Sequence, residues 1–138
     1  MRKNQMFQWA GLSIVFFFFM FGGIGHFIST DFFVKIVPPY IPLPKEVVFL
    51  TGAVEIAGAM ALLFSSYRAR AGIVLIALTV AVTPANIHMW LNPQLFPNVP
   101  AEFLSIRLVL QILLIALIWF STRDEPKTNK SLSASQLP

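Results

Sequence analysis

Four apolar runs, each close to the length of a membrane-spanning helix, dominate this sequence of 138 residues. They cover residues 6–28, 47–64, 71–91 and 103–120. A helix needs roughly 20 apolar residues to cross about 30 Å of hydrocarbon, where backbone groups must find hydrogen-bond partners within their own segment. A soluble chain of this length has too little interior for a composition that is 57 % hydrophobic and 12 % charged. The sequence therefore predicts an all-α integral membrane four-helix bundle, formed by residues 1–120.

The first run also has features of a cleaved signal peptide. Arg2 and Lys3 precede it, and the small residues Gly23 and Gly25 near its end are typical of a cleavage site. Its apolar stretch is longer than the roughly 7–15 residues of a signal-peptide core. This length favours a retained membrane span.

Basic residues flank the four runs unevenly and predict the orientation of the chain. One set lies before the first run, between the second and third runs, and after the fourth: Arg2, Lys3, Arg68, Arg70, Arg123, Lys127 and Lys130. The loop after the third run has no basic residue, whereas the loop after the first carries Lys35 and Lys45. The positive-inside rule then places both termini in the cytoplasm. Residues 121–138 are polar, and we expect them to form a disordered cytoplasmic tail.

Composition excludes several classes of function. The formal charge of +4 is spread over the ends of the apolar runs and does not form the basic patch that nucleic acid needs. The chain has no cysteine, which excludes thiol redox chemistry and cysteine-based metal centres. It also lacks a nucleotide-binding loop and any recognised metal-ligand spacing. We therefore expect no nucleic-acid partner, no metal site and no enzymatic activity from the isolated chain.

Six polar side chains lie inside the apolar runs. They are His26, Glu55, Asn86, His88, Arg107 and Gln111. The helical rise of about 1.5 Å per residue places all six in the half of the bundle that is remote from the termini. An ionisable group in a membrane span costs roughly 2.5–3.5 kcal/mol, so such groups usually face the bundle interior and mark function. The cluster predicts a ligand-binding pocket at the level of the outer leaflet.

Purely structural explanations exist for the same residues. Arg107 and Glu55 can form a buried ion pair between helices, and the two amides can join helices at roughly 0.6 kcal/mol per hydrogen bond. Asn86 and His88 are two positions apart, so they cannot both face one point on a straight helix, although Pro84 is expected to kink this run. Such joints do not require several ionisable groups at one depth. Their number favours a binding site over structural joints alone.

The segment between the first and second runs predicts a cover over this end of the bundle. Apolar residues of 31–37 fall on one helical face, which is typical of a short interfacial helix. The proline-rich stretch 38–44 should then run extended. Pro38, Pro39 and Tyr40 form a candidate lid, with a stiff connector that carries an interfacial tyrosine as the alternative.

Several stretches along the four runs resemble one known family. These stretches are Gly25-His26-Phe27, Ile36-Val37-Pro38-Pro39-Tyr40-Ile41-Pro42, Thr51-Gly52 with Glu55 and Gly58, Pro84-Ala85-Asn86 with His88-Met89, and Arg107-Leu108 with Gln111. In this order and spacing the sequence resembles the DoxX-like family of small four-helix bacterial membrane proteins. The resemblance implies a multi-pass protein of the bacterial inner membrane and an association with quinone-linked redox systems. Relatives include the small subunit of thiosulfate:quinone oxidoreductase and a protein needed for methylamine dehydrogenase maturation.

The pocket and the resemblance together predict an accessory subunit that binds a quinone-type head group beside a membrane or periplasmic redox partner. In this hypothesis His26 and Arg107 bond carbonyl oxygens, Asn86 orients the ligand, and Glu55 exchanges the proton that quinone chemistry requires. An alternative is an assembly factor or chaperone that binds another membrane protein and has no small-molecule ligand. A transporter is a third option, although no inverted repeat is evident. The sequence leaves a homo-oligomer open.

Overall fold

Residues 3–123 are described by the structure, a computed structural model, and this part of the chain folds almost entirely as helix. The helices are α1 (Lys3–Ile28), α2 (Thr30–Ile36), α3 (Pro44–Leu62), α4 (Ser65–Ala81), α5 (Thr83–Leu91), the short 3-10 helix η1 (Pro93–Leu95) and α6 (Ala101–Thr122). The all-α class predicted from the sequence is confirmed. The expected disordered tail lies outside the described residues from position 124 onward, and its first two residues are the last two of α6.

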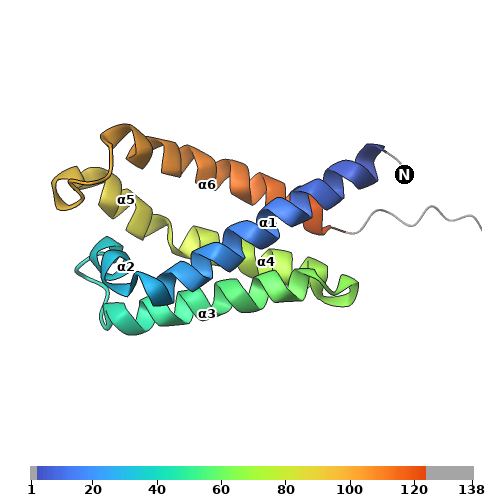
Figure 1. Cartoon of the computed structure of the whole chain (residues 1–138), viewed down its shortest axis with the longest axis horizontal. Helices are drawn as coiled ribbons and strands as arrows, with labels where there is room; N and C mark the ends of the chain where they lie inside the picture. The colour runs from blue at the N-terminus through green and yellow to red at the C-terminus, as the bar shows by residue number, and fades with distance from the viewer. Residues whose placement is uncertain (1–2, 124–138) are drawn as a thin grey trace, which may run out of the picture.

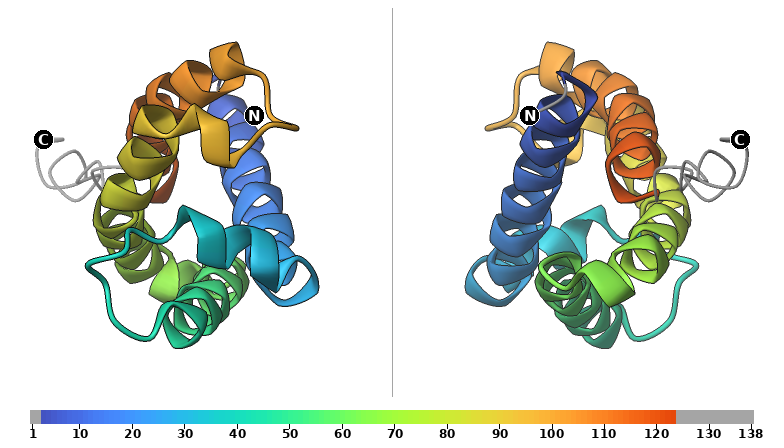
Figure 2. Two further views of the ribbon diagram at one scale, coloured as in Figure 1. Left: turned by 90° about the vertical axis from the view of Figure 1, so that its left-hand side faces the viewer. Right: turned by 90° about the vertical axis from the view of Figure 1, so that its right-hand side faces the viewer.

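Four long helical arms form a closed ring in the order α1, α3, α4 with α5, and α6. Each arm packs against its two neighbours, as the side and end views show (Figures 1 and 2). Successive arms run in opposite directions, because each is joined to the next at one end of the bundle. The start of α1 and the end of α6 therefore lie at the same end, whereas α2, α5 and η1 lie at the other.

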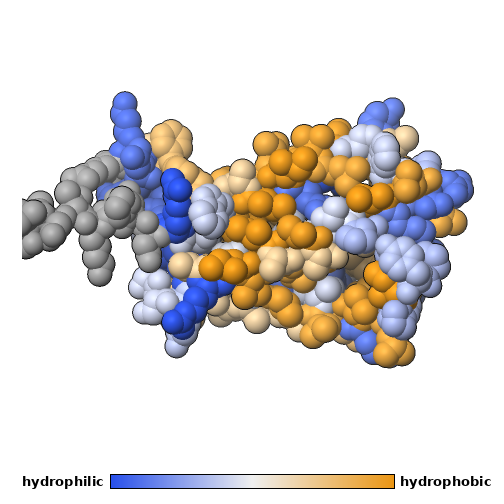
Figure 3. Space-filling model, turned by 180° about the vertical axis from the view of Figure 1, so that it is seen from behind, coloured by the Kyte–Doolittle hydropathy of each residue, from blue (hydrophilic) through white to orange (hydrophobic). Residues whose placement is uncertain are grey.

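Within residues 3–123, three helical segments are long and apolar enough to cross a membrane: Lys3–Ile28, Ser65–Leu91 and Ala101–Thr122. The run predicted at 47–64 forms α3, which has 19 residues but carries Lys45, Glu46 and Glu55 and is not among these three. Many large apolar side chains of the described residues are exposed. On the face drawn in Figure 3 they form a zone between two hydrophilic ends.

Close packing within the ring depends on glycines. A Cβ atom on Gly23 of α1 would lie 2.8 Å from the carbonyl oxygen of Gly52 on α3, so the two backbones are in direct contact. Gly11 and Gly72 provide the same space for residues near the end of α6. Small residues let helices of a membrane bundle approach closely. The face of α3 that carries Gly52 therefore turns into the bundle.

The helix of the third run breaks before Pro84. Helix α4 ends at Ala81, Val82 lies between the two helices, and Pro84 lies in the first turn of α5. Proline has no backbone N–H and cannot continue the hydrogen-bond ladder of a helix. The expected kink is therefore a break between two helices. It gives α5 its own direction and sets how Asn86 faces the interior.

Two apolar clusters fill the interior at different levels. One, near the chain ends, contains Leu12, Val15, Phe19, Ala59, Leu62, Ala71, Leu75 and Ile118. The other, beneath α2 and η1, contains Ile36, Met89, Phe96 and Leu104. The six polar residues predicted to form a site lie at neither cluster. The interior is thus apolar at both levels, and polar side chains are concentrated elsewhere in the ring.

The segment predicted to cover the bundle contains the expected helix but not the expected extended stretch. Residues 31–37 form most of α2, although no side chain caps its first turn. Thr30 instead donates its hydroxyl to the carbonyl of His26 at 2.9 Å, which ties α2 to the end of α1. The Ile41 N–H bonds the Pro38 carbonyl at 3.0 Å, so the chain turns here. The prediction of an extended segment is wrong at this point, because proline also favours turns.

Candidate functional site

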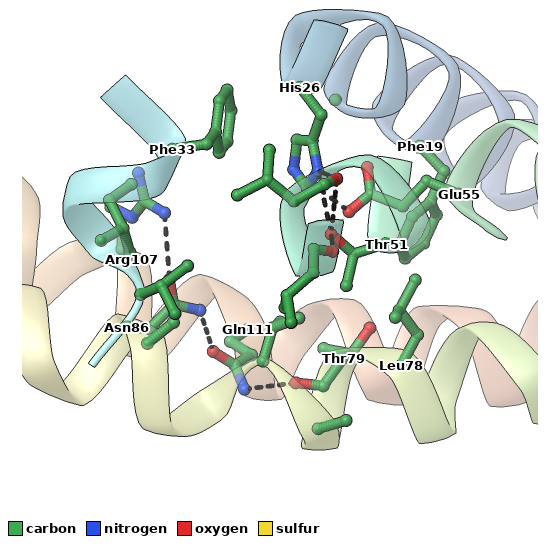
Figure 4. A pocket seen from close by; sticks show the side chains of 18 of the residues that line it. Phe19, His26, Phe33, Thr51, Glu55, Leu78, Thr79, Asn86, Arg107 and Gln111 are labelled. Carbon is green, nitrogen blue, oxygen red and sulfur yellow. Dashed lines mark hydrogen bonds and ion pairs between the residues drawn. The ribbon is translucent and has the colours of Figure 1, made fainter. Parts of the chain in front are cut away.

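A cavity of about 490 Å³ lies inside the ring, bounded by the four arms and by α2. Most of its lining side chains are apolar. Five of the six predicted site residues line it: His26, Glu55, Asn86, Arg107 and Gln111. They are divided between two walls, with His26 and Glu55 on one and the other three on the opposite one (Figure 4).

The first wall is built around His26 of α1. This side chain is 8 % exposed, and its Nδ1 lies 3.0 Å from the Val48 carbonyl oxygen of α3. A carbonyl oxygen can only accept a hydrogen bond, so Nδ1 carries a proton and donates a hydrogen bond to the Val48 carbonyl. Thr51 Oγ1 lies 3.1 Å from the same nitrogen and donates to the Val47 carbonyl at 2.9 Å. The Phe33 ring of α2 lies against the imidazole, with ring centroids 4.1 Å apart. Three helices therefore fix this ring.

Glu55 completes the first wall. Its Oε1 lies 3.7 Å from Nε2 of His26. Nε2 is the ring nitrogen that is not bonded to the Val48 carbonyl. A further proton on Nε2 makes an ion pair, and the same proton on the carboxylate makes a neutral pair. Both of these states hold the shared proton and leave this wall without net charge, whereas loss of that proton leaves one negative charge on it. The His26–Glu55 pair can therefore give one proton to a group in the cavity or take one from it.

The second wall is a chain of hydrogen bonds with a single direction. Arg107 donates from Nη2 to Asn86 Oδ1 at 3.0 Å, and Asn86 Nδ2 donates to Gln111 Oε1 at 2.6 Å. Gln111 Nε2 then donates to the Thr79 carbonyl at 2.9 Å and to the Thr83 hydroxyl. A guanidinium can only donate, so it fixes which end of the Asn86 amide faces it. The Asn86 amide N–H then faces Gln111, which fixes the orientation of the Gln111 amide in turn.

This chain changes two expectations from the sequence. Asn86 was expected to orient a ligand, but both ends of its amide are engaged with Arg107 and Gln111. Asn86 is therefore a positioning residue for Arg107. The structural alternative of an Arg107–Glu55 ion pair is also wrong, because Glu55 contacts His26 and no ion pair of Arg107 occurs among the described residues. Helix depth alone could not show which partner each charged group faces.

His88 and part of the candidate lid lie away from the cavity. The His88 side chain contacts the Asn92 amide nitrogen at 3.2 Å and is not part of the lining. This agrees with the expected divergence of Asn86 and His88. Pro38 is fully buried and lines the cavity, whereas Pro39 and Tyr40 are exposed and do not. The cover over the cavity is thus α2 with Pro38.

Hydroxyl groups are the part of the site that the sequence did not single out. The Thr51 hydroxyl lies against His26 Nδ1, and the Thr83 hydroxyl accepts a hydrogen bond from Gln111 Nε2. Thr79 holds Gln111 through its backbone carbonyl. Threonine in an apolar helix usually bonds its own backbone, as Thr79 does with the Leu75 carbonyl at 2.7 Å. It therefore gives no distinct signal in a sequence.

The cavity reaches the molecular surface at three exposed lining residues, one each on α1, α4 and α6. Phe18 of α1 and Leu110 of α6 both line it and are 54 % and 52 % exposed, and Ala81 of α4 is the remaining exposed lining residue. Helices α1 and α6 are close at the end that holds the chain termini and diverge toward the end that holds α2 (Figure 1). The opening is therefore flanked by apolar side chains that lie on the outer surface of the bundle.

The sequence matches the family described as a domain of unknown function, DUF8561, over residues 15–122, and the chain belongs to this family. The matched range runs from the middle of α1 to the end of α6 and contains both walls of the cavity. No curated protein and no solved structure matches the sequence. The resemblance to the DoxX-like family stays a prediction.

Proposed function

We propose that this member of the DUF8561 family is a multi-pass protein of the bacterial inner membrane that binds the head group of a small amphiphile, as the accessory subunit of a quinone-linked redox system. The observation that carries the proposal is the cavity. Its walls are mainly apolar, a cationic donor lies on one side, and a proton-exchanging pair lies on the other. Such a combination is typical of ligand pockets, which are largely apolar with a few placed polar groups.

The distribution of charge supports a membrane orientation with both termini in the cytoplasm. The end that holds the chain termini carries Lys3, Arg68, Arg70 and Arg123, with no acidic residue among those described there. The opposite end has mixed charge, from Asp31, Lys35, Lys45, Glu46 and Glu102. An excess of basic residues on one side is the usual cytoplasmic signal. In this orientation the cavity lies toward the outer leaflet.

Both ends also carry tryptophan with polar partners, as expected for side chains at a membrane surface. At the terminal end the Arg68 guanidinium lies 5.0 Å from the Trp9 ring centroid. At the other end Trp90 donates its indole N–H to Ser105 Oγ at 3.1 Å. Tryptophan is enriched at membrane–water interfaces because one part of the ring is apolar and another is polar.

A quinone-type head group suits the two walls. Arg107 would donate to one ring oxygen, and the His26–Glu55 pair would exchange a proton with the oxygen on the other side. The apolar tail would leave between Phe18 and Leu110 toward lipid. The redox chemistry itself would belong to the quinone and its partner enzyme.

Native mass spectrometry of the protein in nanodiscs, with identification of the released small molecules, tests this function. We expect an adduct of quinone size that is retained in Glu102→Gln, which removes a carboxylate outside the cavity, and lost in Glu55→Gln. A protein that carries no amphiphile in any preparation would contradict the proposal.

A second candidate, an assembly factor for another membrane protein, is favoured by one observation. Tyr40 is 74 % exposed on the turn beside α2 and does not line the cavity. If assembly is the function, Tyr40→Ala should reduce recovery of the partner complex in cells, and Glu55→Gln should leave it unchanged. The opposite pattern would support the binding protein.

A further inference from the structure

The charges that line the cavity do not balance across it. Its titratable lining groups are His26 from α1, Glu55 from α3 and Arg107 from α6. Helices α2, α4 and α5 place no ionisable side chain in the lining; Asp31 and Lys35 of α2 are not part of it. The single carboxylate lies beside the histidine, at 3.7 Å. The Arg107 guanidinium has no carboxylate at such a distance in the part of the chain that the structure describes.

Arg107 is held by a neutral group. Among the described residues its hydrogen bond is the one from Nη2 to Asn86 Oδ1 at 3.0 Å, and it has no ion pair. A guanidinium has five N–H donors in a rigid fork, so donors remain for a ligand. The chain through Gln111 to the Thr79 carbonyl keeps Asn86, and therefore Arg107, in this position.

Glu55 does not act as the counterion of Arg107. The two side chains lie on opposite walls, and the view into the pocket shows the Phe33 ring between the region of Arg107 and that of His26 (Figure 4). Glu55 faces Nε2 of His26, whose Nδ1 is bound to the backbone of α3. The carboxylate is therefore placed beside His26, and no carboxylate among the described residues lies within ion-pair distance of Arg107. The positive charge of Arg107 has no direct counterion in a mainly apolar cavity.

We infer that the ligand supplies this missing charge: the cavity binds an amphiphile with an anionic head group, a carboxylate or a phosphate, through the free donors of Arg107. The inference rests on the proposed function insofar as it requires a ligand in the cavity. A charged group in a membrane interior is costly unless it is paired. Arginine binds planar carboxylates and phosphates through two parallel hydrogen bonds, and such bonds are stronger than those to a neutral oxygen. An acidic hydroxyquinone would meet this requirement, and a neutral quinone would not.

Three probes with tails of matched length and one neutral quinone test the charge of the head group. We would measure dissociation constants of hexadecanoate, hexadecyl phosphate, hexadecanol and a neutral decyl-benzoquinone for the full chain in nanodiscs of zwitterionic lipid. We expect at least one of the two anions to bind about 10-fold or more tightly than hexadecanol, the difference that one charge-assisted hydrogen-bond pair provides. The stronger of the two anions identifies a carboxylate or a phosphate ligand.

Variants then assign the preference to Arg107. Arg107→Gln should remove the preference for anions, and Arg107→Lys should retain part of it. Arg70→Gln, which removes an exposed positive charge at the other end of the bundle, should leave it unchanged. The comparison of probes on the unaltered protein remains decisive if Arg107→Gln does not fold.

Two other results separate the failure of this inference from that of the proposed function. Tight binding of hexadecanol or the neutral quinone with no preference for either anion would overturn the anionic ligand and leave an amphiphile-binding protein. If none of the four probes binds, both proposals are wrong. An anion preference that persists in Arg107→Gln would overturn the assignment to this residue.

Discussion

Arg107 reaches across from α6 to α5 and donates to Asn86 Oδ1 at 3.0 Å, although a carboxylate, Glu55, lines the same cavity. The hydrogen bond begins a chain that ends at the backbone of α4, through Gln111 and the Thr79 carbonyl. The guanidinium is therefore positioned by amides and is not neutralised by an acid. This arrangement keeps its remaining donors directed to whatever occupies the cavity.

The chain of amides should be a source of stability. Gln111→Leu roughly keeps the volume of the side chain but leaves the Asn86 amide N–H without its partner and removes one of the hydrogen bonds to the Thr79 carbonyl, which keeps the one from Thr83 Oγ1. We expect it to lower the free energy of unfolding by about 1–3 kcal/mol, the cost of leaving buried polar groups unsatisfied. Thermal unfolding in detergent, followed by circular dichroism, measures the change. Gln94→Leu makes the same chemical change at an exposed position and should have little effect. Equal stability of the two variants would contradict this role.

Replacement of glycine by alanine should lower the stability at one position of α1 and have little effect at another. In Gly23→Ala the added Cβ would lie 2.8 Å from the Gly52 carbonyl oxygen, and backbone cannot move aside cheaply. We expect a loss of about 1–3 kcal/mol in stability, as for other overpacked interiors. In Gly25→Ala the nearest atom is a Phe33 ring carbon at 3.6 Å, an ordinary contact. Gly25→Ala should therefore unfold at nearly the same temperature as the unaltered protein. A similar loss in both variants would show that close backbone contact is not the cause.

The fold class and the depth of the polar groups followed from the sequence, because both depend on helix length and rise alone. Residues with the correct depth, such as Glu55 and Arg107, do line one cavity. Their partners could not be predicted, since pairing depends on how each helix is rotated about its axis and on the direction that α5 takes after Pro84. Asn86 and His88 are two residues apart and face different sides of α5, as the period of an α-helix requires.

The end of α6 shows where composition misleads. Ser121 and Thr122 begin a polar stretch and were assigned to the tail, yet both are buried in the structure. They lie against Gly11 of α1 and Gly72 of α4, where only a small side chain fits. Small hydroxyl residues are common at such contacts between membrane helices. Their polarity in the sequence therefore concealed a packing position.

The two histidines should differ in their effect on ligand binding. His26 lines the cavity and contacts Glu55, whereas His88 lies outside it beside Asn92. We expect His26→Gln to weaken binding of the amphiphile by about 10-fold, the equivalent of one hydrogen bond of about 1.4 kcal/mol. His88→Gln should bind as the unaltered protein does. Titration of each variant in nanodiscs with the ligand recovered from the native protein checks this. Weaker binding in His88→Gln alone would place the ligand elsewhere.

The proposed orientation predicts which sites a membrane-impermeant thiol reagent can label. The chain has no cysteine, so a single introduced cysteine reports its own location. Tyr40→Cys should be labelled in intact spheroplasts, because the turn beside α2 would face the outside. Arg70→Cys should be labelled only after the membrane is opened. Labelling of Arg70→Cys in intact spheroplasts would reverse the orientation and move the cavity to the inner leaflet.

Asn86→Asp provides the most direct internal test of the uncompensated charge. The substitution changes one amide to a carboxylate with almost no change in volume, at an atom that already lies 3.0 Å from Arg107 Nη2. An aspartate there would supply the counterion from within the protein, and the guanidinium would gain little from an anionic ligand. We therefore expect hexadecanoate or hexadecyl phosphate, whichever the unaltered protein prefers, to bind about 10-fold or more weakly, with binding of hexadecanol unchanged. Asn98→Asp adds the same charge at an exposed position and should preserve the preference for the anion. If Asn86→Asp retains that preference in full, the cavity recognises the head group by shape, and the charge of Arg107 has another role.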